Sequence, residues 1–205
     1  IPGEKVPFIT SSADYDGSPD VVLLTVKCTG LEEAARDLAS LVGPQTVVAC
    51  CQNGIGTKEL VARYLPAQTI AAMVPFNVAW LEEARLHRGT EGKLLFQDNE
   101  AVKPLVEAWR LMGVPAGTRP DFTPISWGKL LLNLNNAINA LAGVPLLEEL
   151  HSRDYRRILS ACMRELLAAL KKAGITLGET YPKPLVDHAK ARKAALDGYE
   201  AVKQA

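Results

Sequence analysis

The sequence predicts an α/β fold: a doubly wound parallel sheet followed by a wholly helical region. One observation is that apolar runs and helical patterns alternate in βαβαβ order as far as residue 78. Another is that only helical periodicity follows residue 123. Between these regions, Pro115, Gly117 and Pro120 interrupt the pattern. We therefore expect one domain over residues 1–118 and a second over residues 119–205.

The expected strands are continuous apolar runs, which are typical of parallel strands covered on both faces. They are residues 21–26, 46–51 and 69–78. A hairpin is expected over residues 84–97, around Gly89–Gly92. The expected helices have apolar residues at helical spacing. They are residues 31–41, 58–64, 100–112, 125–142 and 153–173.

Composition excludes several classes of partner. The chain has 205 residues, zero formal net charge and 48% hydrophobic residues, which suits a folded protein with a sizeable core. Balanced charge gives no electrostatic reason to expect nucleic acid or an anionic membrane. No apolar run approaches the ~20 residues that span a bilayer. The four cysteines show no metal-binding spacing, so we expect no metal, reduced thiols and a cytoplasmic protein.

An apolar helix with unusual polar residues is the strongest functional signal. At about 100° per residue, Lys129, Asn133 and Asn136 fall within roughly 60° on one helix face. Leucines at 130, 131, 132, 134 and 141 cover most of the remaining surface, so we expect the helix to be largely buried. A buried lysine is costly unless it is paired or used in chemistry. The alternative is a core helix whose lysine reaches solvent and whose asparagines bond to neighbouring loops.

A second polar group follows two predicted strands. Lys27 ends the first strand, and Asn53 with Gly54 ends the second. Ligands of open α/β sheets bind beyond the carboxyl ends of the strands, where both segments are expected. A glycine there lets a flat ring or a phosphate approach the backbone. The alternative is a plain turn in which Asn53-Gly54 supplies a positive φ.

These segments also carry a resemblance. Trp127-x-Lys129-Leu-x-x-Asn133, followed by Asn-Ala-x-Asn-Ala-Leu and Gly143, resembles the active-site helix of the ketopantoate reductase (2-dehydropantoate 2-reductase) family. Residues 21–27 resemble the family's strand that ends in lysine, and residues 52–56 its Gln-Asn-Gly turn. The match runs from about residue 1 to about residue 175. It implies a partial Rossmann-type domain and a helical domain like the C-terminal domain of 6-phosphogluconate dehydrogenases.

The resemblance implies a function and a role for each candidate residue. It implies an NADP-dependent oxidoreductase that reduces the 2-keto acid 2-dehydropantoate to (R)-pantoate in pantothenate and coenzyme A biosynthesis. Lys129 would be catalytic, Asn133 would bind substrate, and the residues that follow the two strands, Lys27, Asn53 and Gly54, would bind the cofactor.

The family's second asparagine usually lies one turn after the first, where this chain has Ala137. Asn136 fits the helix face and Asn139 fits the following Ala-Leu-x-Gly pattern; geometry favours Asn136.

The sequence departs from the family pattern at both ends. It contains no Gly-x-Gly-x-x-Gly turn and begins about where the third strand of the family would lie. After residue 175 nothing matches the family's substrate-binding serine and carboxylate. We therefore expect these 205 residues alone to bind NADP(H) weakly or not at all. Alternative functions are another 2-keto acid or β-hydroxyacid-type NAD(P) dehydrogenase, or a non-catalytic interaction module. A monomer and a homodimer both remain open.

Overall fold

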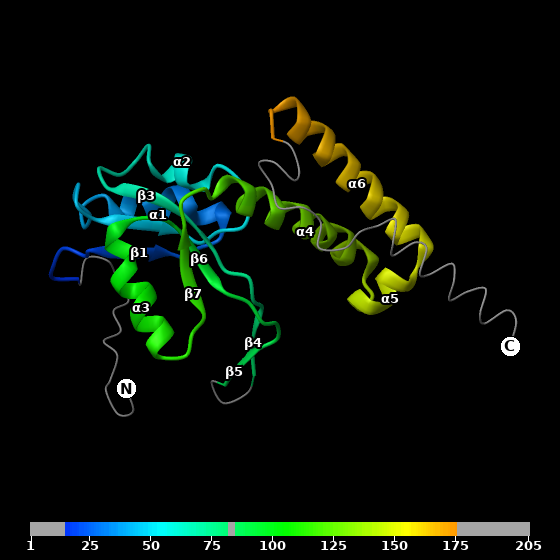
Figure 1. Cartoon of the computed structure of the whole chain (residues 1–205), viewed down its shortest axis with the longest axis horizontal. Coiled ribbons are helices and arrows are strands. Elements are labelled where there is room, and N and C mark those ends of the chain that lie inside the picture. Colours follow the sequence, from blue (N-terminus) through cyan, green and yellow to red (C-terminus); the bar gives the residue numbers. More distant parts are fainter. Residues whose placement is uncertain (1–14, 82–84, 176–205) are drawn as a thin grey trace, which may run out of the picture. The chain divides into compact units, whose positions relative to one another are not determined.

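The computed structural model describes residues 15–81 and 85–175 (Figure 1). The chain forms two compact units, Ile1–Leu132 and Asn133–Ala205. Helix α4 (Thr123–Ala142) runs through the division between them. Because one continuous helix joins the units, their compactness does not test the boundary expected after residue 118, which stays a prediction.

A five-stranded sheet organises the first unit. Its strands are β1 (Val21–Leu24), β2 (Val47–Cys50), β3 (Gln68–Met73), β6 (Leu94–Gln97) and β7 (Ala116–Arg119), in the order β1-β2-β3-β6-β7. Neighbouring strands are parallel except for the antiparallel pair β3–β6. The predicted α/β architecture is confirmed, with a mixed rather than wholly parallel sheet.

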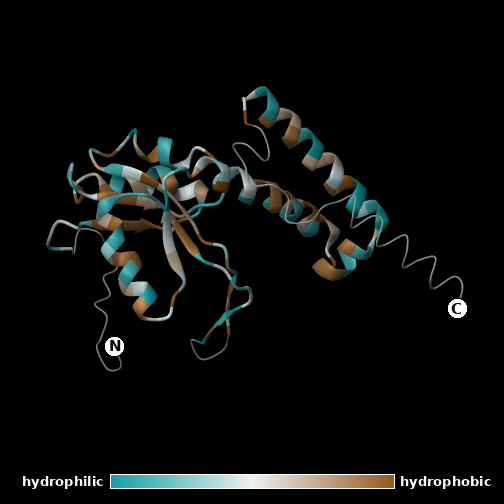
Figure 2. Cartoon of the chain, in the orientation of Figure 1, coloured by the Kyte–Doolittle hydropathy of each residue, from teal (hydrophilic) through white to brown (hydrophobic). Residues whose placement is uncertain are grey.

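Both faces of the sheet are covered, which is what the continuous apolar runs predicted. All four residues of β2 are buried. Val48 and Cys50 belong to the core that packs against α1 (Leu31–Leu38) and α2 (Thr57–Val61). Val47 and Ala49 alternate with them and face the core beneath α3 (Lys103–Leu111). In Figure 2 the central strands are correspondingly brown.

The predicted hairpin over residues 84–97 is wrong. Residues 78–80 form β4 (Val78–Trp80), which pairs antiparallel with β5 (Leu86–Arg88) in a separate two-stranded ribbon. Strand β6 instead joins the main sheet, where Phe96 is 1% exposed. The apolar segment Leu94–Gln97 is buried in the sheet, while every residue of β4 and β5 is exposed.

The segment that Pro115, Gly117 and Pro120 were expected to interrupt contains the strand β7. Ala116 and Gly117 are buried, and β7 runs parallel to β6. The Pro115 carbonyl accepts the Leu94 N–H at 2.8 Å, which extends the pairing beyond the strand. Pro115 and Pro120 therefore flank a short strand that contains Gly117, rather than forming only an interruption between domains. The helix expected over residues 100–112 is confirmed as the 3₁₀ turn Glu100–Val102 followed by α3.

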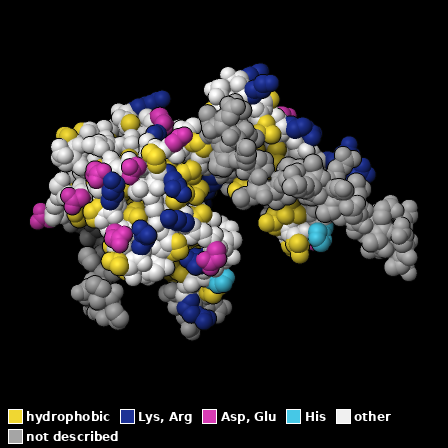
Figure 3. All heavy atoms as spheres, in the orientation of Figure 1, with side chains coloured by type: hydrophobic (Ala, Val, Ile, Leu, Met, Phe, Trp, Pro, Cys, Tyr) yellow, Lys and Arg dark blue, Asp and Glu magenta, His cyan; other side chains and the backbone are white. Residues whose placement is uncertain are grey.

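The second unit contains the end of α4, α5 (Leu146–His151) and α6 (Arg153–Lys172). The helices expected over residues 125–142 and 153–173 are confirmed. The expectation that the first of them is largely buried is wrong in part, because Leu132 is 73% and Leu141 89% exposed. Exposed apolar side chains appear in yellow in Figure 3. Within the described ranges, no helix is both long and apolar enough to cross a membrane.

Candidate active site

The turn after β2 is fixed to the end of β1. Gln52 is 9% exposed, and its Nε2 donates to the carbonyls of Leu24 (2.7 Å) and Val26 (3.0 Å). Two carbonyl acceptors orient the amide, so its oxygen faces away from β1. The Cys28 thiol also donates to the Asn53 carbonyl at 3.3 Å. The segments that follow β1 and β2 therefore meet at one edge of the sheet, as the sequence predicted.

Two glycines shape this turn. Gly54 has φ +104° and Gly56 has φ +84°, a backbone region that other residues enter at a cost. Gly56 is the residue directly before α2. A Cβ built on Gly54 would meet nothing within 4 Å. The turn therefore needs Gly54 for its backbone geometry and also leaves open space beside it.

Lys129 lies partly buried on α4 and does not reach freely into bulk water. Its Nζ donates to the Val74 carbonyl, just beyond β3, at 2.6 Å. Burial lowers the pKa of Lys129, and the nearby Cys51 sulfur acts in the opposite direction. Burial raises the pKa of Cys51 to about 11, so this thiol is neutral at physiological pH. Lys129 is therefore a partly desolvated amino group whose hydrogen-bond acceptor is a neutral carbonyl.

A cavity of about 410 Å³ lies within the first unit, beside Lys129. It is lined by the turn after β2, the end of β3, Gln97 and the start of α4. Of the predicted site residues in this unit, Gly54 and Lys129 line the cavity. Lys27 and Asn53 are exposed and lie outside its lining, although they follow the strands that meet there. A larger hollow of about 670 Å³ lies along α6, and none of the predicted site residues line it.

The asparagines further along α4 have different environments. Asn133 is partly buried and Asn136 is exposed. The Asn139 amide already has two protein partners: its Nδ2 donates to the Glu149 carboxylate at 2.6 Å and to the Val144 carbonyl at 3.1 Å. Glu149 is 1% exposed. This leaves the Asn136 amide more available to a ligand than that of Asn139, which supports the predicted choice without testing it.

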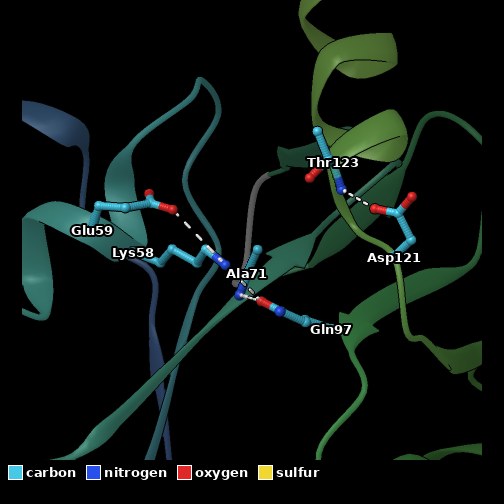
Figure 4. A network of polar contacts seen from close by, with 6 residues as sticks. All are labelled: Lys58, Glu59, Ala71, Gln97, Asp121 and Thr123. Atoms are coloured by element: carbon cyan, nitrogen blue, oxygen red, sulfur yellow. Dashed lines mark hydrogen bonds and ion pairs between the residues drawn. The ribbon is translucent and has the colours of Figure 1, made fainter. Parts of the chain in front are cut away.

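Sequence reasoning did not identify Lys58 as a residue of this cavity. Lys58 Nζ donates to Gln97 Oε1 at 3.0 Å, and the same oxygen accepts the Ala71 N–H at 3.3 Å (Figure 4). Lys58 lies in the first turn of α2, just after the glycine turn, but its partner Gln97 lies 39 residues away in the sequence. The described part of the chain holds no cluster of three or more metal-ligating side chains.

The mixed sheet covered by helices on both faces, with a cavity beyond the carboxyl ends of its parallel strands, defines a Rossmann-type α/β protein. The model of the family described as ketopantoate reductase PanE/ApbA matches residues 4–101. The model of that family's C-terminal part matches residues 121–198. The chain belongs to this family, as the resemblance of its motifs predicted.

Individual relatives agree with the family. A protein of Mycobacterium tuberculosis named 2-dehydropantoate 2-reductase is 32% identical over 162 residues, which are 77% of this chain and 50% of that protein. A dimeric ketopantoate reductase from Staphylococcus aureus has a similar fold, with a TM-score of 0.69 at 20% identity over 82% of this chain and 57% of that one.

A D-mandelate dehydrogenase in a ternary structure with NADH and anilino(oxo)acetate gives a TM-score of 0.70 at 19% identity, over 80% of this chain and 56% of that one. The chain spans about half the length of the curated relative it matches, 50% in the case of the Mycobacterium tuberculosis protein.

Proposed function

We propose that the protein reduces 2-dehydropantoate to (R)-pantoate with NADPH, a step of pantothenate and coenzyme A biosynthesis. The observation that carries this proposal is the partly desolvated amino group of Lys129 beside a cavity that the Gly54 turn also lines. Membership of the ketopantoate reductase family and the name of the Mycobacterium tuberculosis relative support it.

The residues beyond β1 and β2 fit the nicotinamide end of such a cofactor. Gly54 has open space where a Cβ would stand, so a flat ring can approach its backbone closely. Lys27 and Asn53 lie on the two segments that meet beside it. We assign these three residues to the cofactor. When bound, the nicotinamide supplies the hydride. NADP is the proposed form, and NADH in the D-mandelate dehydrogenase neighbour makes NAD the alternative to test.

Lys129 has two tasks in this proposal. Its ammonium stabilises the negative charge that develops on the substrate oxygen, and it then delivers a proton to that oxygen. Burial favours both tasks, because it lowers the pKa of Lys129 and strengthens the electrostatic interaction. The hydrogen bond to Val74 fixes the position of Nζ before substrate binds. Asn133 and Asn136 are assigned to the polar groups of the substrate.

The test is turnover by protein expressed from the complete open reading frame that contains these residues. We expect ketopantoate-dependent loss of NADPH absorbance, and a fall in kcat of at least about 100-fold in Lys129→Ala. Lys103→Ala is the matched control, since Lys103 pairs with Glu100 on the exposed surface. It should retain full activity.

Each other result would change the proposal in a defined way. A higher kcat/KM with NADH would change the cofactor, and a higher value with another 2-keto acid would change the substrate. Equal activity of Lys129→Ala and Lys103→Ala would remove Lys129 from catalysis. No turnover of any 2-keto acid with either nucleotide would refute the enzyme and favour an interaction module.

We also propose that the protein acts as a homodimer in the cytoplasm. The fold similarity to a dimeric ketopantoate reductase from Staphylococcus aureus supports the dimer. The free cysteines, one of them exposed, support a reducing compartment. Light scattering coupled to size-exclusion chromatography measures the mass directly, and a monomer at micromolar concentration would contradict the dimer.

A further inference from the structure

Lys58 places a second ammonium group at the cavity that contains Lys129. Both residues line it, one from the first turn of α2 and one from α4. The Lys58 side chain is 32% exposed, so much of its surface is already desolvated. A partly desolvated ammonium interacts more strongly with an anion than an ammonium in bulk water does.

The contacts of Lys58 leave its charge largely unmatched. Its hydrogen-bond partner is the neutral carboxamide oxygen of Gln97, at 3.0 Å. That oxygen also accepts the Ala71 N–H, so two donors fix its orientation toward Lys58 (Figure 4). Among the described residues, the nearest carboxylate is that of Glu59, which is 3.8 Å away and 59% exposed, so the ion pair is weak. An ammonium carries three N–H donors, and Gln97 accepts one.

The other carboxylate that lines the cavity has a different partner. Asp121 Oδ1 accepts the Thr123 N–H at 3.1 Å, where α4 begins. A carboxylate in that position satisfies a backbone donor of the helix and interacts favourably with the helix dipole. It is therefore engaged by α4 rather than by Lys58, and the Lys58 ammonium retains donors for a ligand.

We infer that Lys58 binds the carboxylate of the 2-keto acid, while Lys129 acts on its carbonyl oxygen. This inference rests on the proposed function and specifies how the cavity recognises its substrate. A 2-keto acid carries a carboxylate and a carbonyl oxygen on adjacent carbons, and the cavity presents two ammonium groups from two separate helices. An uncharged carbonyl compound would use only one of them, so Lys58 makes the cavity selective for acids over esters.

The experiment compares ketopantoate with its uncharged lactone. Affinities are measured by calorimetry on protein from the complete open reading frame, saturated with NADP⁺ so that no reduction occurs. We expect the unmodified protein to bind the acid at least about tenfold tighter than the lactone, as a charge-assisted hydrogen bond implies. Lys58→Met should abolish this preference by weakening the acid alone. Lys58→Arg should retain most of it, and Lys103→Met should retain all of it.

Three kinds of result would overturn the inference. One is an unchanged preference for the acid in Lys58→Met, or no such preference in the unmodified protein. The second is weaker NADP⁺ binding in Lys58→Met with unchanged binding of the acid, which would assign the ammonium to a cofactor phosphate. The third is equally weakened binding of acid and lactone in Lys58→Met together with a lower unfolding midpoint. That result would give Lys58 only a structural role, as a hydrogen-bonded link between α2 and β6. In each case ketopantoate turnover that depends on Lys129 would leave the proposed function intact.

Discussion

Replacing Asn139 by alanine should destabilise the helical unit, whereas replacing Asn136 should not. Asn139 Nδ2 donates to Glu149, which is 1% exposed, and to the carbonyl of Val144 in the turn after α4. Asn139→Ala removes both bonds and leaves a buried carboxylate without that donor. Asn136 is exposed on the same helix, so it serves as the matched control.

The expected magnitude follows from these contacts. A buried acceptor that loses its partner costs about 1–3 kcal/mol, and the partly buried Val144 carbonyl adds about 0.5–1.5 kcal/mol. Alanine's better helix propensity offsets about 0.7 kcal/mol of this loss. The net destabilisation of Asn139→Ala is then about 1–4 kcal/mol. Asn136→Ala changes only the helix propensity at that position, so this variant should be as stable as the unmodified protein or more stable by up to about 0.7 kcal/mol.

Urea unfolding followed by far-UV circular dichroism measures both variants. With a slope of about 2 kcal/mol per molar urea, Asn139→Ala should lower the midpoint by about 0.5–2 M. Glu149→Gln keeps an acceptor for Asn139 and should cost less than Asn139→Ala. Equal midpoints for the two asparagine variants would refute the structural role of Asn139. If Asn139→Ala abolished keto acid binding at an unchanged midpoint, Asn139 rather than Asn136 would be the substrate ligand.

Three further predictions concern the first unit. Gly54→Ala forces φ +104° on alanine and should cost about 1–3 kcal/mol of unfolding free energy. The control Gly30→Ala, at φ −103°, should cost less. Equal costs would show that the positive φ of Gly54 does not require glycine. Gln52→Glu replaces the amide that donates to the Leu24 and Val26 carbonyls by a carboxylate that can only accept, and it should cost about 2–3 kcal/mol of unfolding free energy, measured by urea unfolding. An unchanged midpoint would exclude these two hydrogen bonds. Since burial lowers the pKa of Lys129 below 10.5, the unfolded chain holds a proton that the folded chain has lost between the two pKa values. The unfolding free energy of the unmodified protein, relative to that of Lys129→Met, should therefore rise with pH through that window. Turnover by the unmodified protein should fall over the same window. Parallel stability profiles of the two proteins would refute the lowered pKa of Lys129.

The sheet was predictable where side-chain burial alone decides the structure. Residues 47–50 are apolar throughout and lie at the centre of the sheet, so their pattern reports burial on both faces. The order of the remaining strands depends on contacts between distant segments. Strand β7 has the sequence Ala-Gly-Thr-Arg, which carries no strand pattern, and it forms because β6 supplies its hydrogen bonds. Pairing of β4 with β5 likewise required knowing that β6 joins the main sheet.

The candidate site was predictable to the same extent. Helical periodicity and the family motif identified Lys129, and the rule for open α/β sheets placed Gly54 at the correct edge. Both line the same cavity. Lys58 was missed because a single lysine in the first turn of a helix is usually a solvated residue. Its contact with Gln97 arises only when β6 lies beside β3, an antiparallel pairing that the sequence pattern did not indicate.

The turn after β2 owes its geometry to residues at both of its ends. Gln52 fixes its beginning through hydrogen bonds to Leu24 of β1 and to Val26 just after β1, and Lys58 fixes its end to β6 through Gln97. Between these anchors, Gly54 and Gly56 adopt positive φ angles, which glycine does without strain. The backbone beside the cavity is therefore held by the protein itself before any ligand arrives. Binding then requires little reorganisation of the turn, because its conformational entropy was already lost on folding.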